Sequence, residues 1–242
     1  MRRSALFALA FFLAVCLSFA AAVPLANAEG VFKGDTVTFG SYPQGAEGEI
    51  APIEWTVLDV DEDGYCVLIS VYGLDAKQYN EEWTEITWED CTLRAWLNGE
   101  FCAAAFNEDE QAKMKTVGLV NGDNTEYGTL GGNDTEDRVY ILSLSEVTEY
   151  YDIPRDDFWG KHDELCCKAT DYTSQHSPWV YDSEGFEIYS KYDGNCWWWL
   201  RSPGYDQHYA SRVSYSGYVY NSGDYVFFNR YAVRPVIRVK FE

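Results

Sequence analysis

The sequence predicts an α+β fold on three observations. Two β-rich runs, residues 52–60 and 65–70, flank an Asp-Gly turn, which is the pattern of a β-hairpin. Leu93, Trp96, Leu97 and Phe101 form an apolar stripe at helical spacing, which predicts an amphipathic helix. The C-terminal third contains two further ordered runs, residues 196–204 and 232–242, which favour strands on either side of a polar middle.

The first elements along the chain have recognisable ends. A short strand over residues 35–40 stops at Gly40, and the hairpin follows it. Asp90 is placed to cap the N-terminus of the amphipathic helix. Asn107 and Glu110 form a capping-box pattern for a second, shorter helix that runs to about Lys115.

The middle of the chain is less regular. Residues 138–143 predict another strand, and Ser143 or Ser145 caps a short helix after it, so that the chain has two to three helices in all. Residues 154–194 show no clear period, and we expect irregular structure there, pinned by Trp159, Trp179 and pairs of cysteines.

Composition excludes some classes of partner. The chain has 242 residues and a net charge of −21, which argues against nucleic acid because binding phosphate requires positive charge. Apolar residues make up 47% of the chain, enough for a core. No linker or internal repeat divides residues 29–242, so we expect one domain.

The N-terminus has the pattern of a secretory signal peptide over residues 1–28. Arg2 and Arg3 precede an apolar run, and Ala26-Asn27-Ala28 is a cleavage site. A lipoprotein anchored at Cys16 is the alternative, but Val15 fits that pattern poorly. We therefore expect a secreted or cell-surface protein whose mature chain has no transmembrane segment.

Six cysteines remain after the leader: Cys66, Cys91, Cys102, Cys166, Cys167 and Cys196. In an exported protein they permit up to three disulfides of unknown pairing. A continuous helix would hold Cys91 and Cys102 roughly 16 Å apart, which prevents a bridge between them. His162, His176 and His208 lack the spacing of zinc ligands, so no metal or cofactor is implied.

The polar loop over residues 120–137 carries Asp123, Asn124, Asp134 and Asp137. Calcium could lie among these oxygens, but the EF-hand spacing is missing and a solvated acidic loop is the commoner case.

Residues 205–231 have the composition of a recognition surface. Small residues recur as a frame, namely Ala210, Val213, Gly217, Val219, Gly223 and Val226, and Tyr, Ser, Asn, Asp, His, Arg and Phe lie between them. Tyrosine provides contact area at low entropy cost, and Ser and Asn provide hydrogen bonds. The alternative is a β-rich meander with the same residues in its strands and turns.

No motif indicates an enzyme. Neither a nucleophile elbow nor a phosphate-binding glycine loop is present. Trp198, Arg201 and Arg234 stand in apolar runs, so we expect structural roles, with each arginine bonded to carboxylates or carbonyls.

Four segments together resemble a bacterial domain family of unknown function. These are a PIEW-like hairpin at residues 52–55, TLRAWLN at 92–98 with Phe101 and Ala105-Phe106, DRVYILS at 137–143, and WWLRSPG with VRP at 198–204 and 233–235. The family resembles the C-type lectin fold shared with formylglycine-generating enzymes. The resemblance implies that strands 36–39 and 236–239 pair at the base and that a large irregular region displays the binding surface.

Two departures narrow what the resemblance implies. The E-P-N, Q-P-D and W-N-D motifs of calcium-dependent lectins do not occur, and no cysteine follows Cys196 where the formylglycine-generating enzymes carry a catalytic one. Lectin-like domains also serve as variable proteins of diversity-generating retroelements, whose mutable codons never yield Lys, Glu, Gln, Met or Trp. Residues 205–231 contain none of these except Gln207, which would lie at an undiversified position.

We therefore expect a ligand-binding, receptor-type module rather than an enzyme, with a variable-type segment over about 205–232 and an unknown protein or cell-surface ligand. The alternatives are an enzyme of the formylglycine-generating or another type, and a structural envelope protein. In strands about half of the candidate residues would face the core. The candidate contact residues are Tyr205, Asp206, His208, Tyr209, Arg212, Ser214, Tyr215, Tyr218, Tyr220, Asn221, Asp224, Tyr225, Phe227, Phe228, Asn229 and Arg230.

Overall fold

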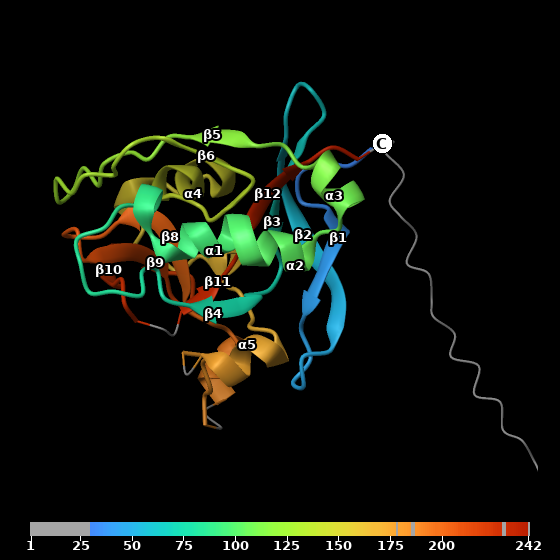
Figure 1. Ribbon diagram of the computed structural model, residues 1–242. Coiled ribbons are helices and arrows are strands. Elements are labelled where there is room, and N and C mark those ends of the chain that lie inside the picture. The colour runs from blue at the N-terminus through green and yellow to red at the C-terminus, as the bar shows by residue number, and fades with distance from the viewer. Residues whose placement is uncertain (1–29, 178, 185–186, 229–230, 242) are drawn as a thin grey trace, which may run out of the picture.

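The protein is built around two five-stranded sheets (Figure 1). The computed structural model describes residues 30–241 except 178, 185–186 and 229–230, so the predicted leader lies outside the described residues. Along the first sheet the strands are β1 (Thr36–Pro43), β2 (Ile50–Val60), β3 (Cys66–Ser70), β12 (Val236–Val239) and β7 (Val139–Tyr140).

The second sheet carries the candidate recognition segment. In spatial order its strands are β10 (Val219–Tyr225), β9 (Tyr209–Val213), β8 (Trp198–Pro203), β11 (Tyr231–Val233) and β4 (Asp75–Lys77). Arg234 and Pro235 join β11 to β12 and so connect the two sheets. The Arg234 Nε donates to the Ser70 carbonyl at 2.8 Å, and the Ser70 N–H donates to the Pro235 carbonyl at 3.0 Å.

The predicted hairpin is present as β2 and β3, which pair antiparallel around the turn that ends at Gly64. The predicted pairing of the terminal strands is wrong. β12 pairs with β3 and β7, while β1 pairs only with β2 within this sheet. The reason is that β3 is buried along its whole length and accepts a neighbour on each side. β1 and the residues that follow β12 are nevertheless in contact, because the Phe39 and Phe241 ring centroids lie 6.2 Å apart.

The predicted amphipathic helix is interrupted. α1 (Thr92–Trp96) continues through a π-helical turn (Leu97–Phe101) into α2 (Cys102–Ala105). Its cap is Cys91 rather than Asp90, because Asp90 ends a preceding 3₁₀ turn (Trp88–Asp90), and the Cys91 sulfur accepts from the Arg94 N–H at 3.4 Å. Leu93, Leu97 and Phe101 are buried as predicted.

The sequence predicts two to three helices, and the described residues contain four when the α1–α2 segment is taken as one. The additional helix, Asp171–His176, lies within residues 154–194, where the sequence predicts irregular structure. The predicted capping box of Asn107 and Glu110 forms, and of the two serines predicted as the next cap Ser143 is the one used, in a capping box with Glu146. The other elements are α3 (Glu108–Lys113), β5 (Val117–Leu119), β6 (Thr135–Asp137), α4 (Leu144–Tyr151), α5 (Asp171–His176), and 3₁₀ turns at Arg155–Asp157, Asp163–Leu165 and Glu187–Tyr192.

We predict that Asn107→Ala lowers the free energy of unfolding by about 1 kcal/mol, since it removes the oxygen that accepts from the Glu110 N–H at 3.0 Å. Urea denaturation followed by circular dichroism measures the loss. Asp109→Ala, in the same exposed first turn, is the control and should cost less. Equal losses would mean that the Asn107 cap contributes no more than an ordinary surface residue.

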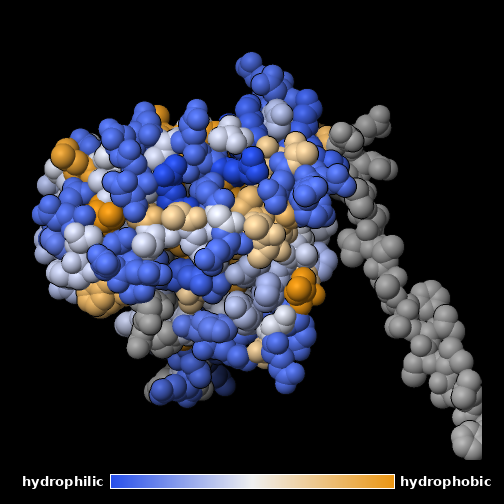
Figure 2. All heavy atoms as spheres, in the orientation of Figure 1, coloured by the Kyte–Doolittle hydropathy of each residue, from blue (hydrophilic) through white to orange (hydrophobic). Residues whose placement is uncertain are grey.

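The buried apolar residues form one cluster that includes both sheets and the α1–α2 segment. Figure 2 shows a largely hydrophilic face, as the net charge of −21 leads one to expect, with a band of apolar residues over α1–α2. No helix in the described part of the chain is long and apolar enough to cross a membrane.

Candidate functional site

Strands β9 and β10 present the candidate recognition segment at an edge of the second sheet. Tyr209 lies opposite Tyr225, and Arg212 lies opposite Tyr220. The register shifts between these two pairs, where Gly223 has a φ of +74° and an added Cβ would lie 2.3 Å from the Ala210 carbonyl oxygen. This irregularity separates two groups of side chains along the strands.

The first group is a continuous aromatic surface, here called the aromatic patch: Trp83, Tyr127, Tyr205, His208, Tyr209, Tyr225 and Phe227. The Trp83 ring stacks on His208 at 4.6 Å and meets Tyr225 at 4.9 Å and Phe227 edge-on at 5.1 Å. Trp83 and Tyr205 remain 52% and 48% exposed. Large aromatic side chains left half exposed in a group are typical of binding surfaces.

The patch continues through tyrosines. Tyr209 lies between Tyr225, at 4.5 Å, and Tyr205, at 4.4 Å, and Tyr127 contacts Tyr205 at 6.4 Å. Desolvation, followed by hydrogen bonds with Tyr225 and Tyr205, raises the pKa of the Tyr209 phenol above its usual value. The Tyr209 phenol is therefore neutral at physiological pH and can both donate and accept hydrogen bonds.

Two loops from distant parts of the chain complete the patch. The Trp83 loop is clamped at both ends, because the Asn80 N–H donates to the Val226 carbonyl at 2.9 Å and the Ile86 N–H donates to the Gln207 carbonyl at 3.0 Å. The Gln207 amide returns a bond to the Ile86 carbonyl at 3.1 Å. These bonds fix Trp83 against the strands.

The Tyr127 loop is held by Asn124, whose side-chain amide is almost fully buried. It donates to the carbonyls of Pro203, at 2.9 Å, and Asn221, at 2.8 Å. The loop that carries Tyr127 is thus fastened to the end of β8 and to β10.

The second group surrounds Arg212 on the same two strands. The Arg212 guanidinium lies over the rings of Trp197, at 4.2 Å, and Tyr220, at 4.4 Å. Its Nε lies 3.3 Å from the Asp224 carboxylate, which also accepts from the Tyr231 hydroxyl at 2.6 Å. Arg212 and Asp224 are therefore engaged with each other and with rings.

Tyr215 and Tyr218 lie beyond this group, toward the turn between β9 and β10. Tyr215 stacks on Tyr181 with centroids 4.0 Å apart and an interplanar angle of 8°. The Lys161 ammonium lies 5.9 Å from the Tyr218 ring centre. These tyrosines join the segment over residues 154–195 to the recognition segment.

Most of the candidate contact residues are partly or fully exposed. Ser214 and Asn221 are exceptions, because both are buried. The Ser214 hydroxyl accepts from the Tyr218 N–H at 3.0 Å, and the Asn221 side-chain amide donates to the Glu126 carboxylate. Asn229 and Arg230 lie outside the described residues. The half-exposed or exposed set is Tyr205, Asp206, His208, Tyr209, Arg212, Tyr215, Tyr218, Tyr220, Asp224, Tyr225, Phe227 and Phe228.

The frame residues alternate with these side chains and point inward. Five of them are buried (Ala210, Val213, Gly217, Val219 and Val226), and Gly223 occupies the irregular position with positive φ. Most frame residues are thus buried, whereas most candidate contact residues are partly or fully exposed.

Sequence reasoning missed Trp83 and Tyr127, because both lie outside residues 205–231. One signal was available for Trp83: it stands in an acidic stretch with Glu81, Glu82 and Glu85, where a buried tryptophan is not expected.

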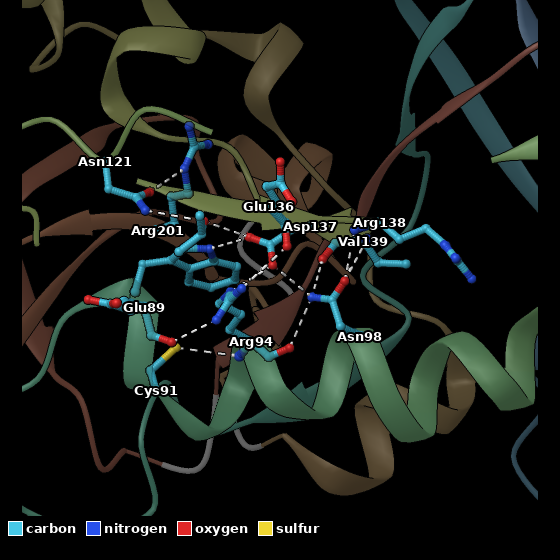
Figure 3. Close-up of polar contacts among 12 residues, drawn as sticks. Glu89, Cys91, Arg94, Asn98, Asn121, Glu136, Asp137, Arg138, Val139 and Arg201 are labelled. Atoms are coloured by element: carbon cyan, nitrogen blue, oxygen red, sulfur yellow. Dashed lines mark hydrogen bonds and ion pairs between the residues drawn. The ribbon is translucent and has the colours of Figure 1, made fainter. Parts of the chain in front are cut away.

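The motifs shared with the resembling family form a polar network around the buried Asp137 carboxylate instead of a site (Figure 3). Asp137 accepts from the Arg94 Nε at 2.6 Å and from the Trp88 indole at 3.0 Å. Asn98 donates to the Val139 carbonyl at 2.9 Å, and its oxygen accepts from the Arg138 N–H at 2.9 Å. The 92–98 motif therefore holds the 137–143 motif in place.

Arg201 and Arg234 are buried, as is Trp198. The Arg201 guanidinium forms an ion pair with Glu146 and donates to the Ile141 carbonyl at 3.0 Å. Its Nε donates to the Asn121 side-chain oxygen at 3.2 Å (Figure 3). The Trp198 indole donates to the Leu165 carbonyl at 3.2 Å. These contacts place the three residues inside the fold, away from the patch.

The oxygens considered for calcium are used separately. Asp123 accepts from the Gly131 N–H at 2.9 Å, and Asp134 accepts from the Asn121 N–H at 3.0 Å. Asp137 belongs to the network with Arg94. Within the described residues, no group of three or more His, Cys, Asp or Glu side chains could hold a metal ion. In this structure no disulfide joins the described cysteines, Cys66 to Cys196.

Comparison with known proteins gives a family but no described activity. No curated protein and no solved structure matches the chain. A family model described as a domain of unknown function, DUF6273, matches residues 63–241. The match includes the motifs at 92–98, 137–143, 198–204 and 233–235 and begins after the one at 52–55. The chain therefore belongs to the DUF6273 family.

Proposed function

We propose that this protein is a ligand-binding, receptor-type module, not an enzyme, that is secreted or surface-associated and binds its ligand through the aromatic patch. The observation that carries the proposal is the patch itself: Trp83, Tyr127, Tyr205 and Phe227 are each at least 36% exposed and are joined by ring contacts. Exposed aromatic surface is unfavourable in water, and its burial against a partner stabilises the complex.

Rigid support of the patch favours a binding role over a mobile loop. Trp83 is fixed by the bonds at Asn80 and Ile86, and Tyr127 by those of Asn124. An ordered aromatic surface loses little conformational entropy on binding, so its contacts contribute fully to affinity.

The proposal extends to diversification by a retroelement. The Tyr, Asp, His, Arg and Phe residues of 205–228 are all partly or fully exposed, whereas most frame residues are buried, together with Ser211, Ser214, Ser216 and Asn221. Gln207, the one residue outside that set, is bonded to both the N–H and the carbonyl of Ile86 and therefore has a fixed structural task. This is the arrangement that a variable surface on a constant frame requires.

We further propose that the fold is of the C-type lectin type. Support comes from the two sheets, the adjacent chain ends at Phe39 and Phe241, and a long region of loops and short helices that carries the binding surface. The different pairing of β1 and β12 is a departure from the arrangement that the resemblance implies.

The ligand is a protein or another cell-surface molecule. Aromatic anchors would supply most of the binding energy, and polar neighbours such as Asp206 would set specificity. The net charge of −21 excludes a polyanion such as nucleic acid.

We predict that Trp83→Ala and Tyr225→Ala each weaken binding by at least about 30-fold, the loss typical of a central interface residue. The fluorescently labelled full chain is applied to arrays of bacterial surface proteins and of glycans, and the affinity for each bound probe is measured. Phe32→Ala, which removes an aromatic residue 68% exposed and outside the patch, is the matched control.

The control should retain the affinity of the unchanged chain. A ligand bound equally by all four proteins would overturn the assignment of the patch, and a turnover of any array probe would overturn the non-enzymatic assignment.

A further inference from the structure

We propose that Cys167 and Cys196 form a disulfide bond that closes the base of the segment over residues 168–195. The inference rests on the positions of the two residues and is independent of what the aromatic patch binds. Both lie where two distant stretches of chain run side by side, next to the start of β8.

The backbones at the two cysteines are already in register. The Cys196 N–H donates to the Cys167 carbonyl at 2.7 Å, and the Ala169 N–H donates to the Gly194 carbonyl at 2.9 Å. Lys168 and Asn195 face one another in an antiparallel bridge, so Cys167 and Cys196 are the next facing pair. Facing residues in antiparallel pairs have Cα atoms about 5.5 Å apart, which is within the range of disulfides.

The two side chains also lie close together. The Cys196 sulfur lies 3.3 Å from the Cys167 carbonyl oxygen, and the interaction of the two thiols shifts the pKa of each. Both residues are at most 2% exposed. No backbone movement is needed to bring the side chains together.

The other cysteines have different neighbours. Cys166 is half-buried, and its sulfur lies 4.0 Å from the His162 carbonyl. The Cys91 sulfur caps α1, Cys102 lies beside Arg138, and Cys66 lies beside Asp61. The geometry therefore selects one pairing out of those that the sequence left open.

Arg234 lies beside two thiols of different acidity. Its guanidinium is buried beside both sulfurs, and its Nη1 has no hydrogen-bond partner. Burial opposes ionisation of Cys167, but the hydrogen bond from Cys196 and the charge of Arg234 outweigh it and lower the pKa of Cys167. The same contact and burial raise the pKa of Cys196. In the folded protein Cys167 is thus the thiol of the pair that ionises more readily.

The bond forms by thiol–disulfide exchange with a small disulfide such as oxidised glutathione or with a disulfide-bearing oxidoreductase. The thiolate of one of the two cysteines attacks the disulfide RS–SR, forms a mixed disulfide and releases RS⁻. The other cysteine then loses its proton to that RS⁻, and its sulfur displaces the second RS⁻ to give the Cys167–Cys196 bond. Two protein thiols are oxidised and one disulfide is reduced to two thiols. Because both sulfurs are buried in the folded protein, the exchange takes place before the segment closes.

The bond would fasten a part of the molecule that extends from the sheets. In Figure 1, α5 lies at the lower end of the molecule, below β4, and the Tyr172 N–H donates to the Gln44 carbonyl at 3.0 Å. Tyr181, within the closed segment, stacks on Tyr215 of the recognition segment. The disulfide thus supports one margin of the proposed binding region.

Peptide mapping without reductant tests the proposal. The full chain is exported from a bacterial host, free thiols are alkylated under denaturing conditions, and the digest is analysed by mass spectrometry. We expect a linked peptide pair that contains Cys167 and Cys196, with Cys66, Cys91, Cys102 and Cys166 alkylated. Cys196→Ser should remove the linked pair, and Cys91→Ser should leave it in place.

A second arm separates this proposal from the prediction of export. The purified full chain is denatured, reduced and refolded in a buffer of reduced and oxidised glutathione, where the same pair should form whatever the protein's location in the cell. Alkylation of Cys167 and Cys196 in both arms, or linkage of Cys167 to another cysteine, would overturn the proposal. The mapping of the unchanged chain suffices if a variant does not fold.

Discussion

Replacing Arg201 with methionine is expected to lower the free energy of unfolding by about 3–5 kcal/mol, because it leaves a buried carboxylate without its counter-charge. The side chains of Arg201 and Glu146 are only 3% and 14% exposed. The guanidinium also serves the Ile141 carbonyl and Asn121, which would lose their partners. Urea denaturation of the purified variant measures the loss.

Two further variants identify the cause. Arg155→Met removes an exposed arginine that contacts Thr125 and Ser145, and it should change stability by no more than about 0.5 kcal/mol. Glu146→Gln added to Arg201→Met should restore part of the loss, since the amide oxygen can still accept from the Ser143 N–H. A double variant no more stable than Arg201→Met would show that the unpaired charge is not the cause.

Gly217→Ala is expected to destabilise the protein by about 2–5 kcal/mol and to disturb the turn between β9 and β10. Gly217 has a φ of +83°, and a Cβ there would lie 2.0 Å from the His162 carbonyl oxygen and 2.7 Å from its carbon. The contact is with backbone, so it cannot be relieved by a side-chain rotation. Thermal unfolding, monitored by circular dichroism, measures the effect.

Gly48→Ala separates the two causes, because Gly48 has the same φ of +83° with no atom within 4 Å of an added Cβ. We expect it to cost about 1–2 kcal/mol from backbone strain alone. If both variants lose the same stability, the close approach to His162 contributes nothing, and the segment over 205–231 is less firmly seated than the structure indicates.

Local chemistry made several elements predictable. The Asp-Gly turn at residues 63–64 predicted the β2–β3 hairpin, and the capping box of Asn107 and Glu110 predicted the start of α3. The start of α4 was predicted to within two residues, at Ser143 or Ser145, and Ser143 is its cap. In each case the residues that define the element contact one another within a few positions, so a single sequence contains the whole cause.

Long-range choices were not predictable in the same way. Nothing local to residues 36–39 or 236–239 shows that β2 and β3 lie between β1 and β12, because that arrangement depends on the burial of β3 in the middle of the sheet. The cap at Cys91 depends likewise on a 3₁₀ turn that ends at Asp90. Tertiary packing decided both.

The candidate site likewise has features that the local sequence predicts and features that depend on tertiary packing. The types of residue in 205–231 indicated a displayed surface, but which side chains face outward depends on the register shift between Tyr220 and Asp224. The burial of Asn221 follows from that irregularity. Trp83 joins the patch only because distant backbone bonds clamp its loop to Gln207 and Val226.

We propose that the exposed side chains in residues 205–228 serve recognition, while the buried frame residues serve the fold. Sequencing the gene and its surroundings in sister isolates tests it most directly. We expect replacements at Tyr205, Tyr209, Tyr225 and their exposed neighbours, an unchanged frame, and a nearby reverse transcriptase with a near-copy of the segment that differs at adenines. Isolates in which residues 205–228 are invariant, or in which the frame changes as often as the exposed positions, would contradict the claim.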